Sequence, residues 1–186
     1  MRNGTGRLWC VAAALGALTA ATVPSAYAAS ADEAPAPLAG AWTAKLVPGS
    51  TAEFRLPGGA VTCDTGTASG TGYTIGQAAW TCSGPLGMTG WAKLSGGALF
   101  APQATGGIER GAVSNFSADL VLDSILGTCI AKISGSLGNA SFNVTTNRFA
   151  VNDGAGITVL SAVNCVGFVN SGDSARFQGE YQVAFT

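Results

Sequence analysis

Apolar and polar residues alternate along most of this chain, and the alternation is clearest at residues 176–186. One face of that segment carries aromatic and aliphatic side chains, and the other face carries charged and amide side chains. The apolar face holds Phe177, Tyr181, Val183 and Phe185. A period of two is typical of a strand that is buried on one side. Gly179 falls on the apolar face, where it predicts a bulge or a close packing contact.

A second long alternation spans residues 112–122, with Phe116, Ala118, Leu120 and Leu122 on its apolar side. Helical spacing also fits this segment, but its serine and asparagine content favours a strand. Shorter strands are expected at 41–47, 52–56, 60–63, 77–82, 88–94, 129–134, 140–145, 148–151 and 157–163.

Turns rich in glycine and proline separate these segments. The turns are Pro48-Gly49, Pro57-Gly58-Gly59, Gly84-Pro85, Gly96-Gly97, Gly106-Gly107, Asn152-Asp153-Gly154 and Ser171-Gly172-Asp173. Many short strands without a convincing helix predict an all-β fold. We expect an antiparallel β-sandwich with two disulfides, because a sandwich accepts irregular strand lengths; a β-barrel is the alternative.

The first 28 residues have the pattern of a secretory signal peptide. Arg2 and Arg7 precede an apolar run at 8–21, and Ala26-Tyr27-Ala28 gives the small-x-small cleavage pattern. The apolar run is shorter than the roughly 20 residues of a membrane-spanning helix. We therefore expect a signal peptide at 1–28 and no membrane span in the mature chain.

The mature chain is expected to be a flexible leader at 29–39 followed by a single β domain at 40–186, secreted and either extracellular or cell-wall associated. Without Arg2 and Arg7, seven cations face ten carboxylates, a net charge of −3. No basic cluster is present, so the chain lacks the charge that drives binding to nucleic acid, and nucleic acid is not an expected partner.

Four cysteines remain after the signal: Cys63, Cys82, Cys129 and Cys165. An even number of cysteines in an exported chain predicts two disulfides. Three pairings are possible; we favour Cys63–Cys82 with Cys129–Cys165, which places one bridge in each half. A metal site is disfavoured, because the chain has no histidine and no Cys-x-x-Cys pair. No metal and no cofactor are expected.

Exposed aromatic side chains are the main candidates for ligand contact. Trp91 and Tyr73 are the possible ligand-contact residues, since an aromatic face beside polar groups suits carbohydrate stacking. Trp80 lies two residues before Cys82 in the expected strand, so it shares the face of that cysteine and is expected in the core. Residues 170–174 contain oxygen ligands that suit Ca²⁺, but a hairpin turn explains the same residues better.

Catalysis has little support in the sequence. A Ser-His-Asp triad is impossible without histidine. A pair of carboxylates, as glycosidases use, is the remaining option, and nothing in the spacing of the acidic residues selects one pair. The acidic residues considered are Glu53, Glu109, Asp119, Asp123 and Glu180. No catalytic residue is assigned.

Three stretches carry a family resemblance. They are Val61-Thr62-Cys63-Asp64, residues 81–89 around Cys82, and residues 164–183 from Asn164-Cys165 through the alternating strand. Together they resemble small secreted, disulfide-containing, β-rich proteins of actinomycetes, especially streptomycetes. The resemblance implies a disulfide-bonded β domain exported by a Gram-positive cell, and it transfers no catalytic residue, substrate or cofactor.

The expected function is therefore that of a secreted non-catalytic extracellular or cell-envelope protein. It would bind a surface component such as a cell-wall polysaccharide or an extracellular protein. The first alternative is a structural or coat protein that self-associates through sheet edges or apolar patches. The second is a small carboxylate-dependent glycoside hydrolase. The oligomeric state does not follow from the sequence.

Overall fold

The computed structural model describes residues 40–103, 107–165 and 167–186, all within the unit Asp32–Thr186. The predicted signal peptide (1–28) and leader (29–39) lie outside the described residues. Within the described residues no helix is long and apolar enough to cross a membrane. The elements are β1 (Ala41–Leu46), β2 (Ala52–Leu56), β3 (Gly59–Thr71), β4 (Thr74–Ser83), the short 3-10 turn η1 (Pro85–Gly87), β5 (Thr89–Leu94), β6 (Ala98–Gln103), β7 (Ile108–Ser124), β8 (Gly127–Asn143), β9 (Arg148–Val163) and β10 (Ser174–Phe185).

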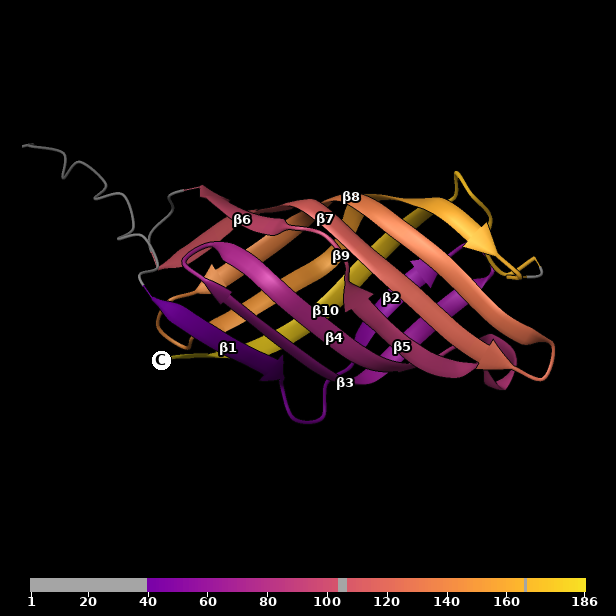
Figure 1. The fold of residues 1–186 in the computed structure, drawn as a ribbon. Coiled ribbons are helices and arrows are strands. Elements are labelled where there is room, and N and C mark those ends of the chain that lie inside the picture. The colour runs from indigo at the N-terminus through magenta and orange to yellow at the C-terminus, as the bar shows by residue number, and fades with distance from the viewer. Residues whose placement is uncertain (1–39, 104–106, 166) are drawn as a thin grey trace, which may run out of the picture. The chain divides into compact units, whose positions relative to one another are not determined.

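The strands form one antiparallel sheet that closes on itself as an eight-stranded barrel (Figure 1). Strands β1 and β2 follow one another in one position of the ring, because both pair with β3 and with β10. Strands β5 and β6 share another position between β4 and β7. The chain therefore runs up and down around the barrel in sequence order.

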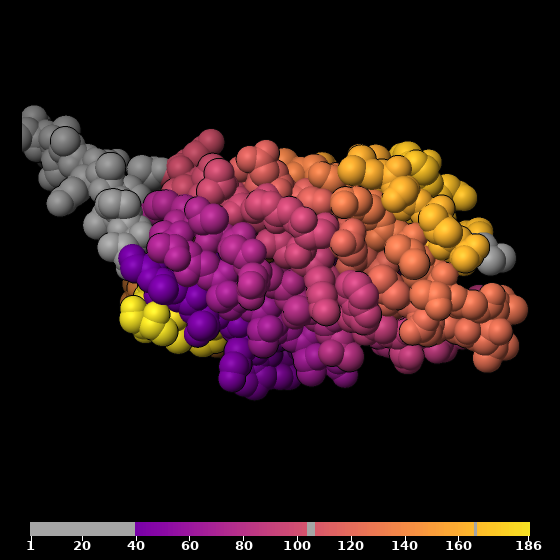
Figure 2. Space-filling model, viewed as in Figure 1, coloured from indigo at the N-terminus to yellow at the C-terminus, as the bar shows by residue number. Residues whose placement is uncertain are grey.

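The all-β, antiparallel prediction is confirmed, and of the two architectures considered the barrel is the one observed. A sandwich would leave two separate sheets, whereas here β10 pairs with β1 and β2, so the last strand of the described residues joins the first two. Figure 2 shows β3, β4, β5, β7 and β8 forming a continuous outer wall on one side.

Several predicted strands are parts of longer ones. Segments 129–134 and 140–145 belong to β8, and segments 148–151 and 157–163 belong to β9. The predicted turn at Asn152-Asp153-Gly154 is wrong: Asp153 has a φ of 49°, yet the residues stay within β9. The pairing of β9 with β10 shifts register beside them, which accommodates the unusual backbone without ending the strand.

Side chains alternate between the barrel interior and the outer face, as the sequence pattern predicts. Phe177 and Tyr181 are buried inside, together with the apolar set predicted for 112–122. Gly179 lies at a register shift, and a Cβ there would come within 3.2 Å of the Ala52 Cβ, so both predicted reasons for this glycine are present.

Both disulfides have the predicted pairing, Cys63–Cys82 and Cys129–Cys165. Cys63 and Cys82 are directly opposite one another on β3 and β4. Cys165 lies in the connection between β9 and β10, and its bridge ties that connection to β8.

Candidate functional site

The two ends of the barrel differ. At the end that we call the Cys165 end, the connection between β9 and β10 turns inward, and Phe168 and Val169 are buried. The Gly58 N–H donates to the Phe168 carbonyl oxygen at 3.0 Å, and a Cβ at Gly58 would lie 2.1 Å from that oxygen. Glycine therefore allows the turn after β2 to close against this connection. The Cys165 end is filled by the chain itself.

The other half of the interior contains a cavity of about 70 Å³. It lies toward the end that we call the Tyr73 end, where the turn between β3 and β4 carries Tyr73. Single cavities hold one water at roughly 10–15 Å³, so this space is several times larger. The residues around it are overwhelmingly apolar.

Small side chains on one part of the wall create this space. Strands β1, β3, β4 and β6 each contribute one alanine to the lining. These are Ala44, Ala68, Ala78 and Ala98. On β3 two glycines continue the pattern: a Cβ at Gly66 would meet the Trp80 ring at 2.5 Å, and one at Gly70 would meet the Trp42 ring at 2.4 Å. The two indole rings thus lie directly against the backbone of β3.

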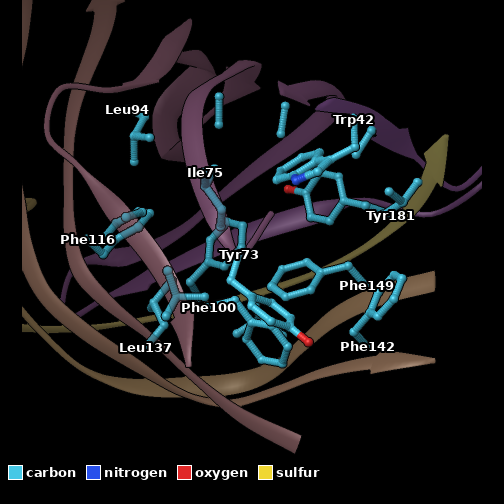
Figure 3. Close-up of a pocket in the computed structure, with 18 of the residues that line it drawn as sticks. Trp42, Tyr73, Ile75, Leu94, Phe100, Phe116, Leu137, Phe142, Phe149 and Tyr181 are labelled. Carbon is cyan, nitrogen blue, oxygen red and sulfur yellow. The ribbon is translucent and has the colours of Figure 1, made fainter. Parts of the chain in front are cut away.

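Aromatic side chains form much of the remaining lining. Figure 3 shows Tyr73, Phe100, Phe142 and Phe149 gathered on one side of the pocket, with Trp42 and Tyr181 on another. The ring centroids of Tyr73 and Phe100 are 6.0 Å apart, and those of Phe100 and Phe149 are 5.5 Å apart. Tilted and edge-on ring pairs of this kind hold one another in place, so this side of the cavity is built from interlocked rings.

The polar atoms of the lining side chains are bonded within the wall. Trp42 Nε1 donates to the Gly72 carbonyl oxygen at 2.8 Å, and Trp80 Nε1 donates to Tyr181 Oη at 2.5 Å. Burial raises the pKa of the Tyr181 hydroxyl above its ordinary value of 10.0, and this effect exceeds the opposite effect of the Trp80 hydrogen bond. Tyr181 is therefore neutral and the cavity surface is apolar.

One carboxyl group lies inside the barrel beside this cavity. Glu109 on β7 is only 2% exposed. Its Oε1 accepts a hydrogen bond from Tyr73 Oη at 3.1 Å. Its Oε2 is buried and has no hydrogen-bond partner among the described residues. Glu109 is also the direct cross-strand partner of Phe142, which lines the cavity.

An irregularity in β7 explains why the sequence pattern misses Glu109. Phe116 and every second residue after it face inward, so simple alternation would place Glu109 outside. Asn115 has a φ of 54°, and the pairing of β7 with β8 shifts register between Val113 and Phe116. Before the shift, the odd-numbered residues of β7 face inward instead of the even-numbered ones, so Glu109 faces inward. The available signal was Asn115 itself, because asparagine is one of the residues that favours left-handed backbone and it lies six positions after Glu109 in the same strand.

The two predicted ligand-contact aromatics are on different surfaces of the wall. Tyr73 is half-buried and lines the interior cavity. Trp91 is 38% exposed on β5, where its neighbour Ala92 faces inward. The structure does not bring Trp91 and Tyr73 together. Trp80 is buried, as expected from its parity with Cys82.

Trp91 belongs instead to an apolar row on the outer face. Register pairs run from Trp91 to Val121, from Val121 to Ile130 and from Ile130 to Val163, across β5, β7, β8 and β9. Ile130 and Val163 are about half exposed. The Lys93 ammonium lies 4.7 Å from the centroid of the Trp91 ring and occupies part of one ring face. We call these four residues the Trp91 row.

The acidic residues considered for catalysis are dispersed. Glu109 faces the interior, and the other four are on the outer face of their strands. There, Glu53 contacts Arg55, Asp119 contacts Lys132, Glu180 contacts Arg148, and Asp123 accepts a hydrogen bond from Thr128. None of these four shares the interior with Glu109, so no pair among the five flanks a common space.

The 170–174 segment is a hydrogen-bonded turn. Asp173 Oδ2 accepts a hydrogen bond from the Asn170 N–H at 2.7 Å, and Gly172 has a φ of 92°. The carboxylate thus satisfies the backbone of its own turn. Across the described residues, no three side chains of the metal-ligating acidic, cysteine and histidine types gather.

Comparisons with protein-family models, with curated proteins and with solved structures find no match to this chain.

Proposed function

We propose that this protein is a secreted, non-catalytic binding protein that takes a small apolar molecule, or the apolar end of a larger one, into the barrel cavity. The observation that carries the proposal is the apolar cavity of about 70 Å³ in the Tyr73 half of the barrel. An eight-stranded barrel is wide enough either to be filled by side chains or to hold one small ligand. The predicted signal peptide and the two disulfides support an oxidising location.

The energetics of packing favour a ligand over an empty space. Protein interiors are close-packed, and an unfilled cavity costs roughly 24 cal/mol per Å³, or about 1.7 kcal/mol here. That is about a tenth to a third of a typical folding free energy of about 5–15 kcal/mol. In the Cys165 half of the same barrel, Phe168 and Val169 are buried side chains of the chain itself. A concave, apolar space inside a stable scaffold is the arrangement expected of a binding cavity.

The proposed route of entry is the Tyr73 end. The connection that holds Phe168 and Val169 fills the opposite end and is bonded to the turn at Gly58. At the Tyr73 end, Tyr73 and Phe149 are only partly buried although both line the cavity. These two rings are therefore the ones that a ligand would meet first.

The test is binding of small apolar probes, xenon and n-pentane, followed by NMR of the methyl groups that line the cavity. Wild-type protein is expected to show saturable shifts at Ala78 and Ala98. Ala78→Leu, which fills the cavity, should abolish them. The matched control is Ala79→Leu, because Ala79 is the next residue on β4 and faces outward. Absence of saturable shifts in the wild-type protein would contradict the proposal.

The Trp91 row supports a second candidate, binding of a surface polysaccharide or an extracellular protein on the outer wall. The row offers an exposed aromatic ring continuous with aliphatic side chains on three neighbouring strands. Retention on purified cell wall, chitin and cellulose, with elution by soluble sugars, tests the polysaccharide version. Trp91→Ala should lower retention without changing the affinity for xenon, and unchanged retention would contradict it.

Self-association remains an alternative that the fold makes less favourable. Closure of the sheet gives β1, β2 and β10 partners on both sides, so the edges that a coat protein could use are paired. Exposed apolar side chains, such as those of the Trp91 row and of Ile125 and Leu126, are the features left to such a role. Sedimentation of the pure protein over a range of concentrations tests this role directly.

A further inference from the structure

Glu109 is the feature of the interior that an apolar binding cavity alone does not explain. Its side chain is 2% exposed, and one of its two carboxyl oxygens has no hydrogen-bond partner among the described residues. Buried polar groups in proteins nearly always have partners, and an exception calls for a specific reason. Tyr73 satisfies only Oε1, at 3.1 Å.

The position of Glu109 connects it to the cavity in two ways. Tyr73, its hydrogen-bond partner, lines the cavity, and Phe142, its direct neighbour on β8, lines it as well. Glu109 thus lies behind the first ring of the lining at the Tyr73 end. Binding of a molecule to the unpaired oxygen therefore requires a movement of the half-buried Tyr73 ring.

The charge distribution restricts what that molecule is. Every lysine and arginine of the described residues is exposed on the outer face. They are Lys45, Arg55, Lys93, Arg110, Lys132, Arg148 and Arg176. An acidic ligand would therefore meet Glu109 without a cation to offset it. A carboxyl oxygen accepts hydrogen bonds, so a hydroxyl or an amine is the complementary group.

We infer that the ligand is an apolar molecule carrying one hydrogen-bond donor, an alcohol or an amine, whose donor binds Glu109 Oε2 while its apolar part occupies the cavity. This inference rests on the proposed binding function. It names the chemical class of the ligand and assigns Glu109 as the residue that selects it. Apolar acids are the class that the same arrangement rejects.

The experiment compares n-pentane, 1-butanol and butyrate in NMR titrations of the wild-type protein and of Glu109→Met. Methionine keeps the length of the side chain and removes both oxygens. The variant should lower the affinity for 1-butanol about tenfold, as expected for the loss of one hydrogen bond. The affinity for n-pentane should stay the same or rise, and butyrate should bind the wild-type protein most weakly.

Two further variants separate selection from positioning. Tyr73→Phe keeps the ring and removes the hydroxyl that donates to Glu109 Oε1, so the affinity for 1-butanol relative to n-pentane should rise, because a second carboxyl oxygen becomes available. Glu180→Met, on the outer face of β10, should change neither affinity. Glu109→Leu repeats the test if the methionine variant does not fold.

The outcomes distinguish the two proposals. If n-pentane binds and 1-butanol loses no more affinity than n-pentane in Glu109→Met, the inference about the ligand class is wrong while the binding function stands. An equal loss for both probes would show that Glu109 only positions Tyr73, which also overturns it. If no probe binds the wild-type protein, the binding function fails and the inference fails with it.

Discussion

Trp80 and Tyr181 are joined by a buried hydrogen bond in which Trp80 Nε1 donates to Tyr181 Oη at 2.5 Å. The two residues lie 101 positions apart in the sequence, on β4 and β10. Both contribute apolar ring surface to the cavity, and the bond satisfies the polar atom that each would otherwise leave in an apolar interior. The bond thus fixes two parts of the cavity wall to one another.

Replacing Tyr181 with phenylalanine removes the acceptor of this bond. The Trp80 N–H then remains buried without a partner, so the free energy of unfolding should fall by about 1–3 kcal/mol. Denaturant unfolding of the wild-type protein and Tyr181→Phe measures the difference. A change below about 0.5 kcal/mol, the range of ordinary surface substitutions, would show that the bond does not stabilise the fold.

The same hydroxyl predicts a pH dependence at alkaline pH. Burial raises the pKa of Tyr181 above its ordinary value of 10.0, so above pH 10.0 the unfolded chain releases a proton that the folded chain retains. The unfolded state then binds fewer protons, and the free energy of unfolding falls as pH rises, by up to about 1.4 kcal/mol per pH unit from this residue.

Unfolding measured at pH values from 9 to 11 tests this dependence. The difference between the wild-type protein and Tyr181→Phe should shrink as pH rises above 10.0, because only the wild type contains this group. Groups that both proteins contain cancel from this difference. Parallel decreases in the two proteins would contradict a raised pKa at Tyr181.

The two disulfides are expected to contribute unequally. They join residues 19 and 36 positions apart, for which chain entropy gives about 3 and 4 kcal/mol respectively. The Cys129–Cys165 bridge also holds the connection that fills one end of the barrel. Replacing that pair with alanine should therefore destabilise the protein more than replacing Cys63 and Cys82.

Amide exchange distinguishes the local effects of the two bridges. The Gly58 N–H, bonded to the Phe168 carbonyl oxygen, should exchange faster without the Cys129–Cys165 bridge. In the variant without the Cys63–Cys82 bridge, the Gly58 N–H should exchange no faster than the loss of global stability explains, because Cys165 still anchors the connection. Equal effects on this amide would show that the bridge does not hold the end closed.

The sequence predicts the strands well because most of them are buried on only one face. Alternation at 176–186 therefore matches β10 closely, and the turns at Pro57-Gly58 and Ser171-Gly172 lie where expected. The sequence does not predict that the sheet closes into a barrel. Closure depends on the pairing of β10 with β1, which joins residues such as Trp42 and Phe185 that are far apart in the chain. The choice between sandwich and barrel depends on that pairing.

Local backbone irregularities limit what alternation reveals about the site. The irregular residue Asn115 lies inside β7 and reverses which side chains face inward, which conceals Glu109. Asp153 resembles a turn residue but stays within β9. The cavity depends on small residues such as Ala44 and Ala98, which come from strands distant in sequence and meet only in the closed barrel.

Glu109 should reduce the stability of the unliganded protein. Its unpaired Oε2 is buried, and leaving a buried polar atom without a partner costs about 1–3 kcal/mol. Glu109→Met should therefore leave the free energy of unfolding unchanged or raise it, whereas Tyr73→Phe should lower it by removing the bond to Oε1. Denaturant unfolding of both variants and of the double variant gives the interaction free energy between Glu109 and Tyr73. If Glu109→Met alone is strongly destabilising, Glu109 is a structural element of the barrel and not a site kept free for a ligand.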